Sequence, residues 1–188
     1  GEIGSVEDTP LASSRKLFEV NYFGHVALIK QIIPHMRVKQ QGKIIALGSL
    51  VSSVPFPFKA QYCASKSALT SFLLALDLEL TPFNITTHIL QPGWIRSNFH
   101  NRLKAISSPR TPYSKHFGPF LNHSKDSNPH YPDGPYLANR ILSIATGHEK
   151  RLLITIGRDA FWIKLLIKFL PYSKFKRLMI RYIYQKQS

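Results

Sequence analysis

The sequence predicts an α/β fold built on a parallel sheet. Three short apolar or β-branched runs, 43–47, 84–91 and 151–156, have the length and composition of buried strands. Segments with helical spacing of apolar residues precede and separate these runs, so strands and helices alternate along the chain. Such alternation is typical of a sheet with helices packed on its faces.

The bulk composition is that of one globular domain with an unusual charge. A chain of 188 residues is long enough to bury one hydrophobic core. Its single cysteine excludes an intramolecular disulfide, and its eight scattered histidines, without cysteine partners, argue against a metal site. There are 25 lysine and arginine residues against 10 acidic ones, a net charge of +15. That charge is compatible with nucleic acid, an anionic membrane or an anionic cofactor.

The first helix is predicted over residues 10–41. Thr9 is placed as its N-cap residue, with Pro10 at the first helical position, a favourable combination at a helix start. Asn21 lies in the middle of this helix, where asparagine has a poor propensity. That position leaves two interpretations open, a functional asparagine or a solvated one.

The stretch from Ser49 to Lys66 carries the most informative chemistry. Ser49 follows the strand at 43–47, at the carboxyl end where open α/β sheets bind ligands. Tyr62 and Lys66 are four residues apart on the helix predicted to run to Leu80, so they project from the same side. A nearby ammonium favours the phenolate and is expected to lower the pKa of Tyr62. Because a serine can hydrogen-bond the same substrate oxygen, this trio suits proton transfer to or from a carbonyl or alcohol.

A Tyr-x-x-x-Lys spacing alone also fits a surface tyrosine on an amphipathic helix, but other segments accompany it here. Tyr62-Cys63-Ala64-Ser65-Lys66 resembles the YxASK motif of the short-chain dehydrogenase/reductase family, and Ser49 lies at the family's usual thirteen-residue distance before the tyrosine. Val20-Asn21-Tyr22-Phe23-Gly24 resembles the family's asparagine segment, and Pro92-Gly93-Trp94-Ile95-Arg96-Ser97-Asn98 resembles its PGxVxT segment. Order and spacing agree over most of residues 1–157.

The resemblance implies a Rossmann-like, doubly wound parallel sheet, a nicotinamide cofactor and a set of site residues. The catalytic residues implied are Asn21, Ser49, Tyr62 and Lys66, with Ser49 and Tyr62 also binding the substrate. The cofactor-binding residues implied are Tyr62, Lys66, Pro92, Gly93, Ile95 and Ser97. NADP is the preferred cofactor, with NAD as the alternative, because the family and the positive charge favour it. By the same resemblance, Asn21 holds a water that connects Lys66 to solvent.

After the Pro92–Gly93 turn the sequence changes character. Residues 98–135 are rich in proline, with aromatic side chains interleaved. Loops of this length are usually functional or disordered, and the family's substrate lid occupies this place. The aromatic side chains suit an apolar substrate, but they are equally suited to pinning the loop to its own domain. A helix over 136–147 and the strand at 151–156 complete a partial Rossmann domain, residues 1–157.

Residues 158–188 are predicted to form basic amphipathic helices interrupted by Pro171. Ten lysine and arginine residues lie between Lys150 and the end of the chain, among leucine and aromatic side chains. This mixture is typical of helices that lie in a membrane surface, and residues 159–186 are the predicted contact. The same apolar face is also compatible with packing on a second copy or on the parent domain.

The family's TGxxxGxG turn and NNAG segment are absent from the 188 residues, so we expect this chain to be the carboxyl-terminal two-thirds of a dehydrogenase. The expected function is an oxidoreductase interconverting a carbonyl and an alcohol on an apolar substrate of lipid, steroid or retinoid type. The alternative is a truncated or inactive fragment acting as a membrane or protein interaction module. The family also implies a homo-oligomer, and the catalytic set argues against nucleic-acid binding. The expected location is membrane-associated and cytosol-facing, with the endoplasmic reticulum as one candidate, or otherwise cytoplasmic.

Overall fold

The computed structural model describes residues 2–98, 103–107, 110–124 and 130–184. Its centre is a three-stranded parallel sheet in the order β2 (Gly42–Leu47), β3 (Ile85–Pro92) and β5 (Leu153–Ile156). Leu47 pairs with Leu90, so the carboxyl ends of β2 and β3 lie side by side. Every residue of β3 except Thr86 is buried, because this strand has a neighbour on each edge and helices over both faces.

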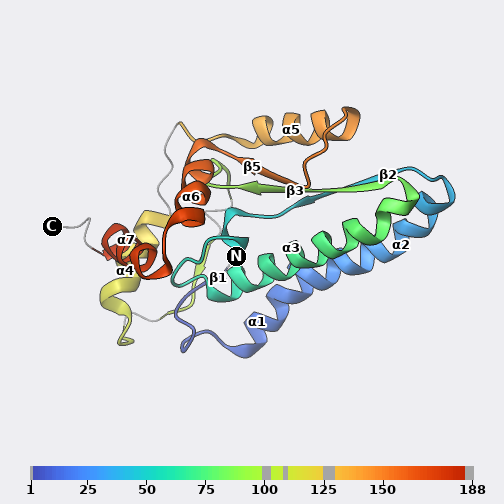
Figure 1. Ribbon diagram of the computed structural model, residues 1–188. Coiled ribbons are helices and arrows are strands. Elements are labelled where there is room, and N and C mark those ends of the chain that lie inside the picture. The colour runs from blue at the N-terminus through green and yellow to red at the C-terminus, as the bar shows by residue number, and fades with distance from the viewer. Residues whose placement is uncertain (1, 99–102, 108–109, 125–129, 185–188) are drawn as a thin grey trace.

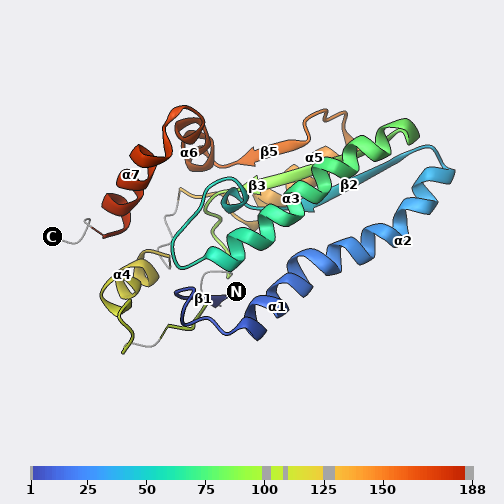
Figure 2. The ribbon, with the colours of Figure 1, turned by 60° about the horizontal axis from the view of Figure 1, so that its bottom comes forward.

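Helices cover both faces of the sheet (Figures 1 and 2). On one face, α1 (Leu11–Phe18), a π-helical turn η1 (Glu19–Phe23) and α2 (Gly24–Val38) follow one another alongside α3 (Ala60–Leu80). On the other face lies α5 (Gly134–Thr146). Two short 3-10 turns, η2 (Leu50–Ser52) and η3 (Thr81–Phe83), follow β2 and α3. The predicted doubly wound α/β arrangement is confirmed.

The core consists of two apolar layers, one on each face of the sheet. The layer between α3 and the sheet contains side chains that are almost completely buried: Leu69, Leu73, Ile85 and Ile89. The second layer joins α5 to the strands through Ile144, Leu90, Ile154 and Ile156. Burying each such side chain contributes about 1.5–3 kcal/mol. This packing holds the ends of β2, β3 and α3 in a fixed relation to one another.

The first helix begins one residue later than predicted and is capped differently. Thr9 does not cap it, because its Oγ1 donates a hydrogen bond to the Ser5 carbonyl at 2.6 Å and Pro10 is the N-cap residue. The helix ends at Val38, three residues earlier than predicted. Asn21 lies mid-helix as predicted, within the π-helical turn. This rare backbone form is frequent at functional sites.

The segment predicted as a lid, residues 98–135, packs on the domain where it is described. Its β4 (Lys104–Ala105) pairs with β1 (Glu2–Ile3), and its α4 (Ser114–Ser124) buries Phe117 and Phe120 next to Ile3. Phe58 packs against both of these rings, with centroids 5.3 Å apart in each pair. These aromatic side chains pin the segment to its own domain. Residues 99–102, 108–109 and 125–129 lie outside the described residues, and the lid role stays a prediction.

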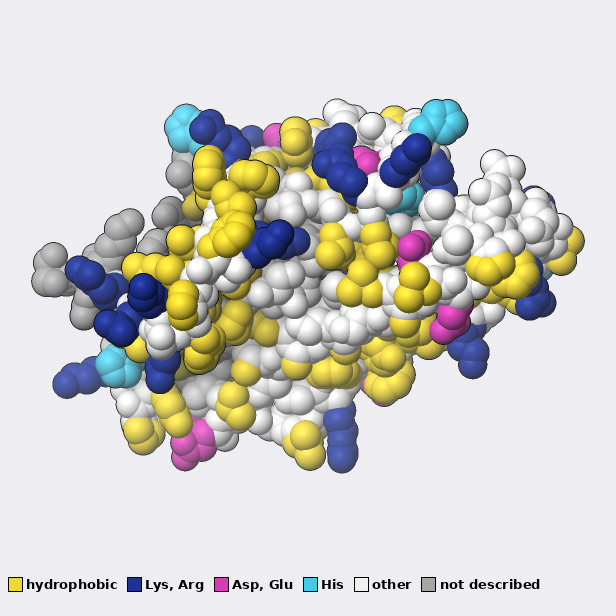
Figure 3. All heavy atoms as spheres, viewed as in Figure 1, with side chains coloured by type: hydrophobic (Ala, Val, Ile, Leu, Met, Phe, Trp, Pro, Cys, Tyr) yellow, Lys and Arg dark blue, Asp and Glu magenta, His cyan; other side chains and the backbone are white. Residues whose placement is uncertain are grey.

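The carboxyl-terminal segment forms two helices, α6 (Arg158–Phe169) and α7 (Tyr172–Tyr184), with Pro171 between them as predicted. One side of the pair packs on the domain, where Ala160 and Phe175 are buried in a cluster with Leu50, Val54 and Phe56. The other side is exposed. Figure 3 shows hydrophobic side chains gathered over α6, beside lysine and arginine side chains over α7. Packing on the parent domain and an exposed apolar face therefore occur on different sides of the same helices.

Candidate active site

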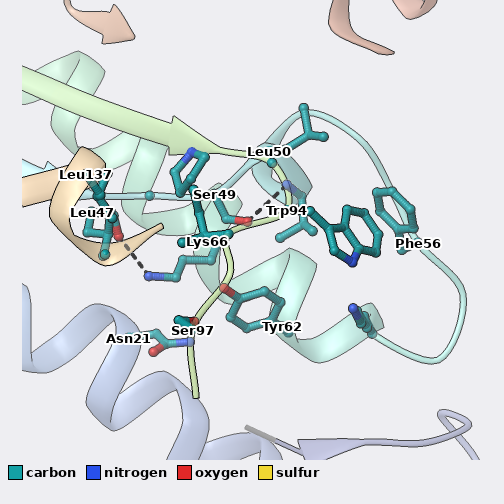
Figure 4. A pocket seen from close by; sticks show the side chains of 17 residues that line it. Asn21, Leu47, Ser49, Leu50, Phe56, Tyr62, Lys66, Trp94, Ser97 and Leu137 are labelled. Carbon is teal, nitrogen blue, oxygen red and sulfur yellow. Dashed lines mark hydrogen bonds between the residues drawn. The ribbon is translucent and has the colours of Figure 1, made fainter. Parts of the chain in front are cut away.

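A cavity of about 400 Å³ lies at the carboxyl ends of β2 and β3. Its volume is in the range of ligand sites, and open α/β sheets bind ligands at this place. The eight site residues predicted from the sequence all line it: Asn21, Ser49, Tyr62, Lys66, Pro92, Gly93, Ile95 and Ser97. Figure 4 shows the Tyr62 oxygen and the Lys66 nitrogen on the same side of the cavity, with Asn21 and Ser97 close to them. The fold thus brings together residues that are far apart in the sequence.

Ser49 and Tyr62 reach the cavity from two different elements. Ser49 follows β2 as the N-cap residue of η2, and its Oγ accepts a hydrogen bond from the Val51 amide at 3.4 Å. Tyr62 lies in the first turn of α3. Burial raises the pKa of Tyr62 above its ordinary value, and a hydrogen bond with Ser49 opposes this rise in part. That hydrogen bond keeps the two hydroxyl groups together, as they must be if both bind one substrate oxygen.

Lys66 is buried one turn further along α3. Its Nζ donates a hydrogen bond to the Leu47 carbonyl at 2.9 Å. Burial lowers the pKa of Lys66, because desolvation disfavours the charged form. The predicted lowering of the Tyr62 pKa by this ammonium is wrong for this arrangement, in which the pKa of Tyr62 is raised. Helical spacing placed both groups on one side, but it could not show how far the tyrosine is removed from water.

Asn21 is held against α3 from the π-helical turn. Its Nδ2 donates a hydrogen bond to Ser65 Oγ at 3.0 Å, and Ser65 Oγ donates in turn to the Tyr62 carbonyl at 2.9 Å. His25 lies on the next turn, and its pKa is lowered by burial and by the positive charge of Lys66. Asn21 is therefore a fixed polar group on the cavity wall, whereas the water it is expected to hold stays a prediction.

The turn after β3 is set by close packing against the start of α6. A Cβ at Gly93 would overlap Asp159 Oδ2 and lie 2.9 Å from the Cβ of Ala160, so glycine is needed for this approach. Asp159 Oδ2 also accepts a hydrogen bond from the Trp94 amide at 3.0 Å. These contacts hold the loop that carries the predicted cofactor-binding positions 92–97.

Sequence reasoning missed several residues that line the same cavity, among them Phe56, Lys59, Trp94 and Leu137. Phe56 and Trp94 pack edge to face, with ring centroids 5.8 Å apart, and make one wall apolar. Only the fold brings these two rings together, so no local pattern could have found them. For Lys59 a signal existed, because positions 59, 62 and 66 share one side of a helix.

The polar residues fit one end of a dinucleotide. Hydroxyl, amide and ammonium groups of Ser49, Tyr62, Asn21 and Lys66 line a cavity whose other walls are largely apolar. Such groups can bind ribose hydroxyls and a carboxamide. A glycine-rich phosphate-binding turn does not occur in the sequence. The fit is therefore to a nicotinamide and its ribose, with Lys66 and the loop 92–97 as the residues that would hold them.

Comparisons with known proteins agree on one family. The family model described as short chain dehydrogenase matches residues 2–106. The mouse protein named Dehydrogenase/reductase SDR family member 7B is 39% identical over 95 residues, which are 50% of this chain and 29% of that protein. Human Retinol dehydrogenase 8 is 34% identical over 105 residues, which are 56% of this chain and 34% of that protein. The chain spans well under two thirds of the length of both relatives.

A solved structure extends the match to the whole chain. The crystal structure of a short-chain dehydrogenase from Streptomyces avermitilis covers 100% of this chain and 68% of its own chain, with a TM-score of 0.74 and 26% sequence identity. The fold described above, including α6 and α7, is thus similar to a known arrangement.

Proposed function

Because the chain belongs to the short-chain dehydrogenase family, we propose that the protein is an oxidoreductase that interconverts a carbonyl and an alcohol on an apolar substrate. The observation that carries this proposal is a single cavity that holds Ser49, Tyr62, Lys66 and Asn21 together, with largely apolar side chains on its other walls. Such a site suits proton transfer at one oxygen of an otherwise apolar molecule, as a lipid, steroid or retinoid would be. The related human protein is named for retinol, a molecule of this kind.

Each polar side chain has a part in this reaction. During reduction Tyr62 donates its hydroxyl proton to the carbonyl oxygen, and during oxidation it accepts the proton of the alcohol. Ser49 hydrogen-bonds the same oxygen and keeps it next to the Tyr62 hydroxyl. The nicotinamide cofactor, when bound, supplies or accepts the hydride. Lys66 binds the ribose of the cofactor, and Asn21 supports the path of the proton from Lys66 to solvent.

The proposed cofactor is NADP, with NAD as the alternative. The net charge of +15 favours the dinucleotide that carries the additional phosphate. The ratio of kcat/KM with NADPH to that with NADH measures this preference directly. A ratio below one would show that NADH is the preferred cofactor and would leave the proposed reaction unchanged.

Hydride transfer itself tests the proposed function. NADPH and NADH that carry deuterium at both C4 positions are offered, with a panel of long-chain aldehydes, ketosteroids and retinaldehyde, to the protein in the full length that its gene encodes. The expected product is an alcohol with deuterium on its carbinol carbon. Bound cofactor without deuterium in any product would contradict the proposal and favour the interaction module. Cofactor binding by residues 1–188 is measured separately and is expected to be weak, because these residues contain no glycine-rich phosphate-binding turn.

We also propose that α6 and α7 attach the protein to an anionic membrane surface. Four aromatic side chains on these helices are largely exposed: Phe161 (55%), Trp162 (62%), Phe169 (74%) and Tyr172 (71%). Four cationic side chains on α7 are exposed beside them: Lys174, Lys176, Arg177 and Arg181. Aromatic rings insert at the level of the lipid headgroups, and each cation near an anionic surface contributes about 1 kcal/mol. Charge complementarity therefore favours anionic lipid as the partner of this face.

Within the described residues, no helix has the length and hydropathy needed to cross a bilayer. Flotation with vesicles of phosphatidylcholine, with and without phosphatidylserine, tests the surface attachment. The protein is expected to float with the anionic vesicles only, and Trp162→Ser combined with Phe169→Ser is expected to abolish flotation. Leu142→Ser, which replaces a 61% exposed leucine on α5, is the control. Unchanged flotation of the double variant would contradict the proposal. A homo-oligomer and a cytosol-facing location stay predictions.

A further inference from the structure

Lys59 is a buried cation on the wall of the cavity, and the proposed reaction does not use it. It is the N-cap residue of α3 and is 8% exposed. Its Nζ lies 5.5 Å from the ring centroid of Trp94 and 5.5 Å from that of Phe120. In the part of the chain that the structure describes, its ammonium makes no hydrogen bond and no ion pair.

The surroundings of Lys59 are positive and lack a compensating carboxylate. None of the described residues that line the cavity is acidic, and Lys66 is a second lysine among them. Lys66 donates to the Leu47 carbonyl, whereas Lys59 lies over the faces of two rings and has Cys63, whose thiol pKa burial raises, as its titratable neighbour. The amino-terminal end of a long helix adds a positive partial charge at the position of Lys59. Among the described residues the protein offers this ammonium no hydrogen-bond acceptor, and desolvation by burial lowers the pKa of Lys59.

The two rings fix the position of the ammonium. Trp94 comes from the loop after β3 and Phe120 from α4, and attraction of the cation to both ring faces holds Nζ between them. An apolar side chain at position 59 could also pack between the loop after β3 and α4, and its burial would carry no desolvation penalty. The site therefore has the features of an anion-binding position: a fixed cation, a helix N-terminus, apolar walls and no acceptor of its own.

We propose that Lys59 binds an anionic oxygen group, a carboxylate or a phosphate, of the apolar carbonyl substrate. The inference rests on the proposed function and adds a substrate class to it, namely acidic amphiphiles. The carbonyl lies at Tyr62, the apolar body lies along Phe56 and Trp94, and the acidic group lies at Lys59. The bound anion provides the hydrogen-bond acceptor that the described residues of the protein do not offer to the Lys59 ammonium.

The first experiment measures binding and needs no turnover. The sequence contains two tryptophans, so Trp162→Phe leaves Trp94 as the only indole, next to Lys59. Dodecanoate and dodecanol are titrated below their aggregation limits into Trp162→Phe, with and without Lys59→Met, and the Trp94 fluorescence is followed. Dodecanoate is expected to bind about tenfold or more tightly than dodecanol, and this preference is lost in Lys59→Met. Equal binding of the two ligands before Lys59 is substituted would overturn the proposal.

The second experiment measures specificity in turnover, with a long-chain keto acid and its methyl ester as the substrate pair. Lys59→Met is expected to lower kcat/KM for the acid about tenfold and to leave the ester within about twofold, while Lys59→Arg keeps the preference for the acid. Lys115→Met, which replaces an exposed lysine on α4, is the control. An equal fall for acid and ester would overturn the proposal.

The two experiments separate this inference from the function on which it rests. Turnover of neither substrate, with dodecanoate still preferred at Trp94, would reject the proposed function and leave the anion site standing. Turnover of the ester with no preference for the acid would support the proposed function and reject the anion site. If circular dichroism shows that Lys59→Met is unfolded, Lys59→Gln replaces it. The comparison of dodecanoate and dodecanol binding to Trp162→Phe, in which Lys59 is intact, still decides the outcome.

Discussion

The side-chain amide of Asn21 donates a hydrogen bond to Ser65 Oγ across 3.0 Å, and Ser65 belongs to the helix that carries Tyr62 and Lys66. Ser65 is completely buried. This contact joins the π-helical turn to the helix that bears the proposed proton-transfer pair. The position of Asn21 in the cavity therefore depends on a residue that does not itself line the cavity.

Ser65→Ala is expected to lower the free energy of unfolding by about 1 kcal/mol, because the half-buried Asn21 amide loses its acceptor. It is also expected to lower kcat about tenfold, since Asn21 is no longer held in place. Urea denaturation and steady-state kinetics measure the two effects. Ser71→Ala, on an exposed position of the same helix, is the control and should change neither. Full turnover by Ser65→Ala would show that the contact does not position Asn21 for the reaction.

The pH dependence of alcohol oxidation is expected to shift in Ser49→Ala. Tyr62 must be deprotonated to accept the proton of the alcohol, so the rate rises as the pH passes the pKa of Tyr62. Burial raises this pKa and the hydrogen bond with Ser49 lowers it. Removal of the Ser49 hydroxyl therefore raises the pKa, and the rising limb of the rate profile moves to higher pH. A limb that stays in place, or moves to lower pH, would contradict this assignment.

Gly93→Ala is expected to destabilise the protein by about 1–3 kcal/mol, because the added Cβ overlaps the carboxylate that holds the Trp94 amide. Cofactor affinity should fall with it, since the loop 92–97 moves. Gly118 offers a control: among the described residues, apart from its chain neighbours and the backbone of its own helix, no atom lies within 4 Å of a Cβ placed there. Gly118→Ala is expected to cost less than Gly93→Ala, and it gains little from reduced backbone freedom because Pro119 follows and disfavours a Cβ on a helical residue before it. Thermal denaturation that ranks the two variants in the opposite order would refute the close-packing argument.

Substitutions of Lys164 and Lys168 are expected to have different effects on stability and on vesicle flotation, although both residues belong to α6. Lys164 Nζ donates a hydrogen bond to Gln91 Oε1 at 2.6 Å, and Gln91 is completely buried. Lys164→Met leaves that acceptor unpaired and should cost about 1–3 kcal/mol of stability. Lys168→Met should stay within about 0.5 kcal/mol, because Lys168 is exposed. Vesicle flotation should respond only to Lys168→Met, and equal stability of the two variants would contradict this division.

The strands and helices could be predicted because their signals are local. The run before Pro92 is short, apolar and β-branched, whereas the apolar stripe from Leu69 to Leu80 follows the helical period, and the structure contains both elements. Thr9 was misplaced because a side chain that can cap a helix can also bond a nearby carbonyl, here that of Ser5. Only the geometry of the turn decides between these two partners.

The positions of the candidate site residues could be predicted from the sequence, but the burial of their side chains could not. Motif spacing identified Ser49, Tyr62 and Lys66, and the fold brings them to one cavity. The direction of the Tyr62 pKa shift depends on burial by segments distant in sequence, which no spacing records. The same holds for α6, where apolar residues occur on several sides and only the structure shows that Ile163 faces the core while Phe161 is exposed.

Turnover and cofactor binding by Tyr62→Phe, measured on one preparation of the protein in the full length that its gene encodes, test the central claim most directly. The substitution removes one hydroxyl and keeps the ring that fills the cavity wall. The account predicts that turnover falls about 100-fold or more, while the dissociation constant of NADPH changes less than about tenfold. Turnover within about tenfold of the unsubstituted protein would show that Tyr62 is not the proton donor, and would contradict the proposed function of the cavity.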